Sequence, residues 1–207
     1  MSYSRSFEQV TGAARDGSLF KPQRGTQYEV GVKTDLFDNK LSATLALYEL
    51  TLTNVLTSDP INPDFDVQTG EQRSRGVELS VTGEILPGWN VIGFYGYTDA
   101  RVTKDNNIPV GNRVFGVPDN VASLWTTYTF PTGSLKGFGG GIGFNYVGDK
   151  KPDSLNTFTI PSYFLTDAAL YYRNNNFSIG LNLNNIFNVR YYEASFSNLQ
   201  RIIPGRP

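Results

Sequence analysis

The side chains that most often do chemistry in proteins are missing from this sequence. It contains no histidine and no cysteine among its 207 residues. Histidine is the commonest general base and the commonest metal ligand, and cysteine supplies thiolates and disulfides. The sequence therefore excludes a histidine-dependent catalytic triad, a typical zinc site and thiolate chemistry from these 207 residues.

The remaining ionisable residues do not form a recognisable reactive pattern. The 19 acidic residues show neither a clustered carboxylate pair nor the spacing of a metal-binding loop. The 18 basic residues balance them to a net charge of −1, and no basic stripe is present. We therefore predict that the chain is not an enzyme, holds no cofactor of its own and has no nucleic-acid partner.

The connectors between strands alternate in length along the chain. Between residues 27 and 188 we count about eight segments of roughly ten residues with alternating character. The tight connectors are residues 37–40, 86–88, 131–133 and 174–176, and the long ones are residues 55–70, 102–119 and 148–161. Antiparallel hairpins alone do not sort their connectors in this way. A barrel in an outer membrane does, because short turns lie at its periplasmic rim and long loops at the outer rim.

The segments themselves alternate between apolar and polar residues. Tyr28, Val30 and Val32 fall on one face of a strand, and Glu29 and Lys33 fall on the other. Hydrophobic residues make up only 39% of the chain, yet aromatic residues reach 14%. This combination fits a barrel with an apolar outer face, a polar, water-exposed inner face and aromatic residues at its rims. Composition alone also allows a soluble β-sandwich, but a sandwich does not need alternating connector lengths.

Charged and aromatic residues sit where the rims of such a wall are expected. Arg73 and Arg75 begin one strand, which suits the rim because an outward charge in the apolar band costs about 2–4 kcal/mol. Trp89 beside a short turn and Tyr97 near the far end of its strand match two interfacial girdles. With long loops outside, the chain ends at the outer rim.

A cluster of glycines in residues 137–143 puts bare backbone on at least one face of a strand. Glycine weakens a strand unless something must approach the backbone closely. The sequence leaves two explanations open, an object packed inside the barrel and curvature of the strand.

Several short motifs together resemble one known family. They are Ser74-Arg75-Gly76-Val77-Glu78-Leu79, the turn Pro87-Gly88-Trp89-Asn90, Val117-Pro118 leading to Ser123-Leu124-Trp125-Thr126-Thr127-Tyr128, and Asn185-Ile186-Phe187-Asn188 leading to Arg190-Tyr191-Tyr192. In this order they resemble the C-terminal half of the barrel of TonB-dependent siderophore receptors. The resemblance covers essentially the whole chain. Asn188 departs from it slightly, because the family more often has aspartate there.

The resemblance implies the fold class and the domain organisation. We expect an all-β chain with antiparallel meander topology, forming about eight strands of a transmembrane barrel of roughly 22 strands. Residues 1–207 would then be a partial TonB-dependent receptor β-barrel domain. The plug domain, the first half of the barrel and the closing strand are expected to be absent, and the TonB complex would act through the missing plug region.

The resemblance also implies a function and a location. The family captures ferric siderophores at the cell outer membrane of Gram-negative bacteria, so the expected partners are a ferric siderophore, the TonB complex and outer-membrane lipid. Iron would arrive already wrapped by the siderophore, in agreement with the missing metal ligands. A hydroxamate type such as ferrichrome is expected, with catecholate and citrate-based ligands left open. The alternatives are a passive outer-membrane pore and a non-functional truncated receptor.

Ligand recognition should then depend on aromatic and polar side chains of the long outer loops. Phe196 lies next to the place where related hydroxamate receptors put a ligand-contacting aromatic residue. The further candidates on outer loops are Tyr192, Phe65, Phe115 and Arg113. For each of these, packing of one loop against another is the alternative explanation.

Overall fold

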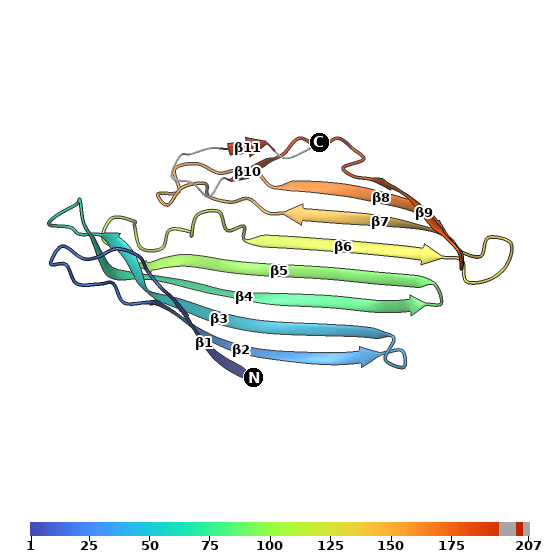
Figure 1. Cartoon of the computed structure of the whole chain (residues 1–207), viewed down its shortest axis with the longest axis horizontal. Coiled ribbons are helices and arrows are strands. Elements are labelled where there is room, and N and C mark those ends of the chain that lie inside the picture. The colour runs from blue at the N-terminus through green and yellow to red at the C-terminus, as the bar shows by residue number, and fades with distance from the viewer. Residues whose placement is uncertain (195–201, 205–207) are drawn as a thin grey trace.

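Nine antiparallel strands form one meandering sheet, in which each strand pairs with its neighbours in the sequence (Figure 1). The computed structural model of the chain describes residues 1–194 and 202–204. The strands are β1 (Ser2–Glu8), β2 (Gln23–Leu36), β3 (Leu41–Ser58), β4 (Asp66–Leu86), β5 (Trp89–Lys104), β6 (Asn120–Thr129), β7 (Phe138–Val147), β8 (Tyr163–Arg173) and β9 (Ser178–Leu183). The sheet is open, with β1 and β9 as its edges. This confirms the expected all-β, antiparallel meander.

The short and long connectors lie at opposite ends of the sheet. In Figure 1 the short connectors gather at the right and the long connectors at the left. The turn at residues 37–40 uses left-handed backbone at Phe37, Asp38 and Asn39, and Gly88 supplies a positive φ of 83° after Pro87. The predicted segregation of connector lengths is confirmed for residues 9–22, 105–119 and 148–162, which are longer than every connector at the opposite end, but not for residues 59–65, which are fewer than residues 130–137.

The expected long connector at residues 55–70 is wrong over most of its length. β3 continues to Ser58 and β4 begins at Asp66, so only residues 59–65 connect them. Two register shifts, between Thr53 and Val55 and between Val55 and Thr57, accompany a left-handed Asn54 with φ of 60°. A bulge of this kind lets the ladder continue past an irregular residue. The sequence pattern instead predicts that the strand ends at Asn54.

Three other boundaries differ from those expected. β5 runs to Lys104, so the next connector is residues 105–119, and the short connector between β6 and β7 is residues 130–137. The final strand, expected at residues 177–187, is limited to Ser178–Leu183. After it the chain forms a small two-stranded sheet of β10 (Tyr192–Ala194) and β11 (Ile202–Pro204), in a stretch expected to be loop.

The register of the ladders gives the sheet two different faces. One row of paired residues crosses four strands as Val32, Leu45, Leu79 and Tyr95. The row one residue away reads Lys33, Thr44, Ser80 and Phe94. Directly paired residues point to the same face, so the sheet has an apolar face and a mixed, mainly polar face. These are the lipid-facing and lumen-facing sides that the alternation predicted.

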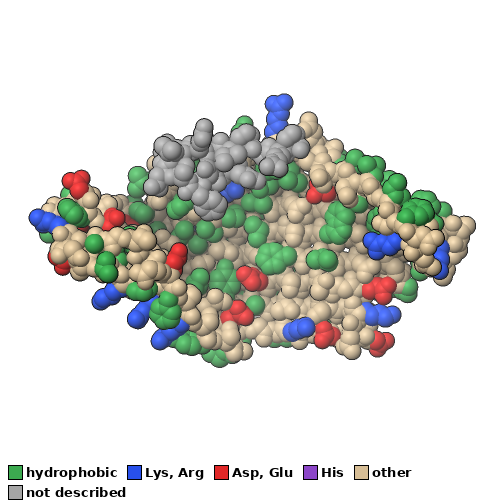
Figure 2. Space-filling view, in the orientation of Figure 1, with side chains coloured by type: hydrophobic (Ala, Val, Ile, Leu, Met, Phe, Trp, Pro, Cys, Tyr) green, Lys and Arg blue, Asp and Glu red, His purple; other side chains and the backbone are tan. Residues whose placement is uncertain are grey.

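Exposed apolar residues dominate this single layer, and the few buried ones lie both at the long-loop end and within the strands, as Leu41 and Ala169 do. Val32 is 68% exposed and Ile92 61%, because no second layer covers either face. The buried apolar side chains include Phe20, Val102 and Ile160, all of which lie in or beside the long connectors. The space-filling view shows hydrophobic side chains scattered among polar atoms on the face drawn, with charged side chains both at its borders and near its middle (Figure 2). Side chains of the long connectors are therefore packed against one another and against the adjoining strand ends.

No described residue belongs to a helix with the length and apolarity needed to cross a membrane.

Candidate functional site

The four long connectors and the strand ends that carry them form one bonded region at the left of Figure 1. They are residues 9–22, 59–65, 105–119 and 148–162. Hydrogen bonds join connectors 9–22, 105–119 and 148–162 to a neighbouring strand end or to a neighbouring connector. We call this region the loop collar.

The first joint of the loop collar is made by Gln68 at the outer end of β4. Its Oε1 accepts a hydrogen bond from the Lys21 backbone N–H at 2.7 Å, and its Nε2 donates to the Lys21 carbonyl and to the Asn54 carbonyl. Asn54 Nδ2 in turn donates to the Pro22 carbonyl at 3.0 Å. The end of connector 9–22 is therefore held on the β3–β4 hairpin by two amide side chains.

The second joint is a turn organised by Asp105. Its Oδ1 accepts from the backbone N–H groups of Asn107 and Ile108, both at 2.9 Å, and from the Thr57 hydroxyl at 2.9 Å. Asn106 donates from its backbone to Thr57 Oγ1 and from its side chain to the Ser58 carbonyl. Burial raises the pKa of Asp105, but these hydrogen bonds outweigh burial and hold the pKa below its ordinary value.

We expect this second joint to weaken in acid. A carboxyl whose pKa is lowered by folding stabilises the fold above its ordinary pKa of 3.8, and that stabilisation is lost as the pH falls through the lowered value. When the pH is lowered from 7 to below the pKa of folded Asp105, the amides of Asn107 and Ile108 should exchange faster, after correction for intrinsic rates. Asp105→Ala should show the fast exchange at both pH values.

Asp64→Ala is the matched control for the second joint, because Asp64 is an exposed aspartate in the neighbouring connector. It should leave the exchange of Asn107 and Ile108 unchanged at either pH. Acid-insensitive exchange in the unaltered protein would contradict the assignment of Asp105 as the group that holds the turn.

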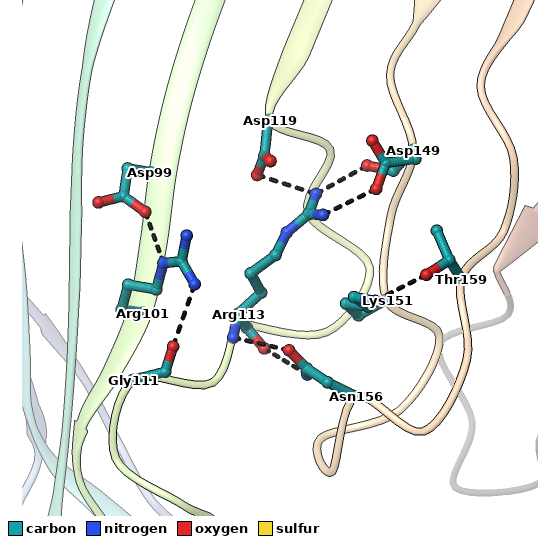
Figure 3. Close-up of polar contacts among 9 residues, drawn as sticks. All are labelled: Asp99, Arg101, Gly111, Arg113, Asp119, Asp149, Lys151, Asn156 and Thr159. Atoms are coloured by element: carbon teal, nitrogen blue, oxygen red, sulfur yellow. Dashed lines mark hydrogen bonds and ion pairs between the residues drawn. The ribbon is translucent and has the colours of Figure 1, made fainter.

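The third joint is a clasp built on Arg113 (Figure 3). Its Nη1 lies 2.8 Å from Asp149 Oδ2, and its Nη2 lies 2.8 Å from Asp119 Oδ1 and donates to the Asp149 carbonyl at 2.7 Å. The Arg113 side chain is only 11% exposed. Forked contacts of this kind to carboxylate and carbonyl oxygens suit the planar guanidinium. Arg113 therefore joins connector 105–119 to connector 148–162.

The backbone around Arg113 is bonded to the same neighbouring connector. The Arg113 N–H donates to Asn156 Oδ1 at 2.9 Å, and Asn156 Nδ2 donates back to the Arg113 carbonyl at 3.0 Å. Asn112 Nδ2 donates to the Ser154 carbonyl at 3.0 Å. Asn156 has a φ of 58°, which asparagine tolerates better than most residues. The clasp is thus a side-chain ion pair reinforced by an amide bridge.

The charges around the clasp compete with one another. Burial raises the pKa of Asp119 above its ordinary value, the Arg113 guanidinium lowers it, and the nearby Asp149 carboxylate raises it again. Beside this group, Arg101 Nε donates to Asp99 Oδ1 at 2.6 Å and Arg101 Nη1 donates to the Gly111 carbonyl. The second arginine therefore holds the start of the same connector against β5.

Aromatic and amide contacts fix the chain after β9. The rings of Tyr163 and Tyr191 lie 4.4 Å apart, and Lys150 Nζ lies 5.9 Å from the centre of the Tyr163 ring. Asn185 is buried, and its side chain bonds to both backbone groups of Val189. These contacts bring the segment before β10 beside connector 148–162.

The structure places four of the five predicted ligand-binding residues on the long-loop side. Arg113 and Phe115 lie in one segment, and Phe115 is 41% exposed. Phe65 is 41% exposed at the tip of the β3–β4 hairpin, and Tyr192 is 51% exposed at the start of β10. Phe196 lies outside the described residues. The structure does not test ligand contact for any of the five, so that role stays a prediction.

Sequence reasoning missed the partners that hold Arg113, namely Asp119, Asp149 and Asn156. Asp119 precedes β6 and Asp149 follows β7 closely, and β6 and β7 pair with Val121 opposite Val147. Two acidic residues just beyond paired strand ends are a signal that could have predicted a shared cation. Asn156 offered no such signal, because it sits within an irregular connector.

The described part of the chain has no cluster of metal-binding side chains. No set of three or more His, Cys, Asp or Glu side chains is placed to hold a metal ion there. What the loop collar offers is a set of exposed aromatic rings on loops held by ion pairs and amide bridges. Such a surface can bind a ligand that brings its own metal.

Sequence comparison gives the family. The profile described as TonB dependent receptor-like, beta-barrel matches residues 1–186. The metal-pseudopaline receptor CntO of Pseudomonas aeruginosa is 42% identical over 206 residues, which is 99% of this chain and 29% of that protein. The ferrichrome outer membrane transporter/phage receptor of Escherichia coli is 40% identical over 201 residues, which is 95% of this chain and 27% of that protein. The chain thus spans less than a third of the length of these relatives, which are named as receptors and transporters and not as enzymes.

Solved structures agree with the family. The ferric-catecholate import receptor Fiu of Escherichia coli superposes with a TM-score of 0.82 at 26% identity, covering 99% of this chain and 30% of that chain. The receptor PiuA of Acinetobacter baumannii superposes with a TM-score of 0.78 at 29% identity, covering 92% of this chain and 29% of that chain. The chain belongs to the TonB-dependent receptors, whose β-barrel lies in the outer membrane of Gram-negative bacteria.

Proposed function

We propose that this chain supplies part of the wall and of the outer loops of a receptor for ferric siderophores, energised through TonB. The observation that carries the proposal is the loop collar, which holds exposed aromatic rings at one end of a sheet with an apolar and a polar face. An aromatic, polar surface at the outer rim suits the capture of a bulky chelate. Contact with TonB would be made by a plug domain and not by these strands.

Within this class we propose a hydroxamate ligand. Two relatives are named for ferrichrome and ferrioxamine B, at 40% and 34% identity, and both of these ligands are hydroxamates. Two other relatives are named for pseudopaline, at 42% identity, and for a catecholate, at 30% identity. The relatives thus cover more than one ligand type, and the hydroxamate assignment needs a direct comparison of ligands.

The function is tested by titrating outer membranes that contain the protein with a ferric hydroxamate. Phe115→Ala should weaken binding about tenfold, which corresponds to about 1.4 kcal/mol, because large exposed aromatic rings carry much of the energy of such sites. Phe37→Ala is the matched control, since Phe37 is also exposed but lies in a short turn at the opposite end. It should bind as tightly as the unaltered protein.

A ferric catecholate titrated in parallel tests the ligand type. Preference for the hydroxamate supports the assignment, and preference for the catecholate overturns it while leaving the receptor function in place. If neither ferric complex binds, or if Phe37→Ala weakens binding as much as Phe115→Ala, the proposed site is wrong.

A further inference from the structure

We propose that Arg113 is a positioning residue, which clamps two long loops together and so fixes the place from which Phe115 meets the ligand. The inference rests on the proposed function and deepens it. It also replaces the expectation that Arg113 itself contacts the siderophore.

The first step is that the Arg113 guanidinium is already occupied. Its two terminal nitrogens contact the Asp119 and Asp149 carboxylates and the Asp149 carbonyl, at 2.7 to 2.8 Å. Its Nε is buried, with no hydrogen-bond partner among the described residues. A ligand could use these nitrogens only by displacing the two carboxylates, and a mostly buried charge that loses its partners is costly. The guanidinium is therefore arranged to hold protein and not ligand.

The second step is that the segment carrying Phe115 is held on both sides. Before Phe115, the Val114 N–H donates to the Ala100 carbonyl of β5 at 3.0 Å. After it, the Gly116 N–H donates to the Lys151 carbonyl of connector 148–162 at 2.7 Å. The Phe115 ring remains 41% exposed between these two bonds. The segment thus bridges a strand and a neighbouring loop, with its one aromatic ring turned to the surface.

The third step is that the bond between Gly116 and Lys151 depends on Arg113, because Arg113 holds the two loops together. Connector 148–162 is an irregular loop. Its contacts with connector 105–119 include Arg113 with Asp149 and Asn156 with Arg113 (Figure 3). The backbone bond between Gly116 and Lys151 adds a third contact. Without the ion pairs, Asp119 and Asp149 would repel each other across the gap. We therefore expect the two loops to separate, and Phe115 to lose its fixed position.

A double-mutant cycle tests the inference through ferric hydroxamate binding. Arg113→Gln removes the charge, and it should weaken binding roughly tenfold, within the range found for coupled neighbouring residues. In a protein that already carries Phe115→Ala, the same change should have almost no further effect. Arg113→Lys, which keeps the charge without the fork, should bind with intermediate affinity.

A second measurement reads the loops without any ligand. The chain has no cysteine, so spin labels can be placed at two introduced cysteines without background from this chain. Val110 and Leu155 are suitable sites, because they are 67% and 59% exposed on the two joined loops. Pulsed dipolar spectroscopy should show one narrow distance distribution in the parent protein and a broad one with Arg113→Gln.

Each outcome decides one point. Losses that multiply in the double variant would show that Arg113 acts on binding independently of Phe115 and would overturn the inference. An unchanged distance distribution with Arg113→Gln would also overturn the inference. A loss of binding sites with unchanged affinity would overturn it too, because that result indicates misfolding. If the parent protein binds no ferric siderophore, the proposed function fails, while the spin-label result still decides whether Arg113 clamps the loops.

Discussion

Replacing Gly143 by valine is expected to destabilise the sheet by about 3 kcal/mol, the upper end of the cost of overpacking. Gly143 lies in β7 directly opposite Trp125 of β6. The indole of Trp125 covers the glycine so closely that an added Cβ would collide with the ring. The same ring covers Gly141, where an added Cβ would lie 2.9 Å from it. A valine at position 143 must push the indole away from both glycines of β7.

Gly180→Val is the matched control for this prediction. Gly180 lies on the same face of the sheet in β9, and an added Cβ there would have its nearest neighbour, Tyr171 Cβ, at 3.7 Å. Valine favours strands, so this change should be neutral or slightly stabilising. The urea midpoint of the protein in lipid vesicles, followed by heat-modifiable mobility on gels, measures both variants. Equal destabilisation by the two valines would show that loss of glycine matters and contact with Trp125 does not.

This packing adds an explanation to the two that the sequence left open. The glycine cluster allowed either an object packed inside the barrel or curvature of the strand. The structure shows a third arrangement, in which aromatic rings from the two neighbouring strands lie over the glycines. Trp125 of β6 covers Gly141 and Gly143, and Tyr171 of β8 covers Gly139. Sequence alone could not show this, because the register that sets each ring opposite its glycine depends on both hairpin turns.

The sheet was predictable where a strand has two different faces. Val30 and Val32 alternate with Glu29 and Lys33, and this period of two fixed both the strand and its orientation. The outer ends of the strands were not predictable by the same reasoning. In β4, residues 66–75 are mostly polar on both faces, since neither side of this stretch meets lipid. A ladder that continues beyond the apolar band leaves no alternating pattern to detect.

The candidate site was predictable as a set of loops but not as a set of contacts. Arg113 was correctly placed in a long connector, yet its partner Asp149 is 36 residues away and Asn156 is 43 residues away. Irregular connectors have no periodicity from which such pairs could be inferred. The resemblance to a receptor family favoured ligand contact for a loop arginine, whereas the geometry gives its hydrogen bonds to the neighbouring loop.

Asn185→Ala is expected to cost about 3 kcal/mol, because it leaves two backbone groups without partners and puts alanine in a left-handed position. Asn185 is 8% exposed and has a φ of 48°. Its Oδ1 accepts from the Val189 N–H at 2.8 Å, and its Nδ2 donates to the Val189 carbonyl at 3.0 Å. The loss should loosen the turn that follows β9 and therefore the attachment of Tyr191 to Tyr163.

Asn188→Ala separates the two parts of that cost. Asn188 also has left-handed backbone, with φ of 51°, but it is exposed, and its contact in the described structure is a backbone bond to the Asn185 carbonyl. Its replacement should cost only the backbone preference, about 1 kcal/mol. The difference between the two alanine variants, measured as a shift of the urea midpoint, then isolates the side-chain bonds of Asn185. If the two variants unfold at the same urea concentration, those bonds contribute nothing, and the asparagine is needed only for its left-handed backbone.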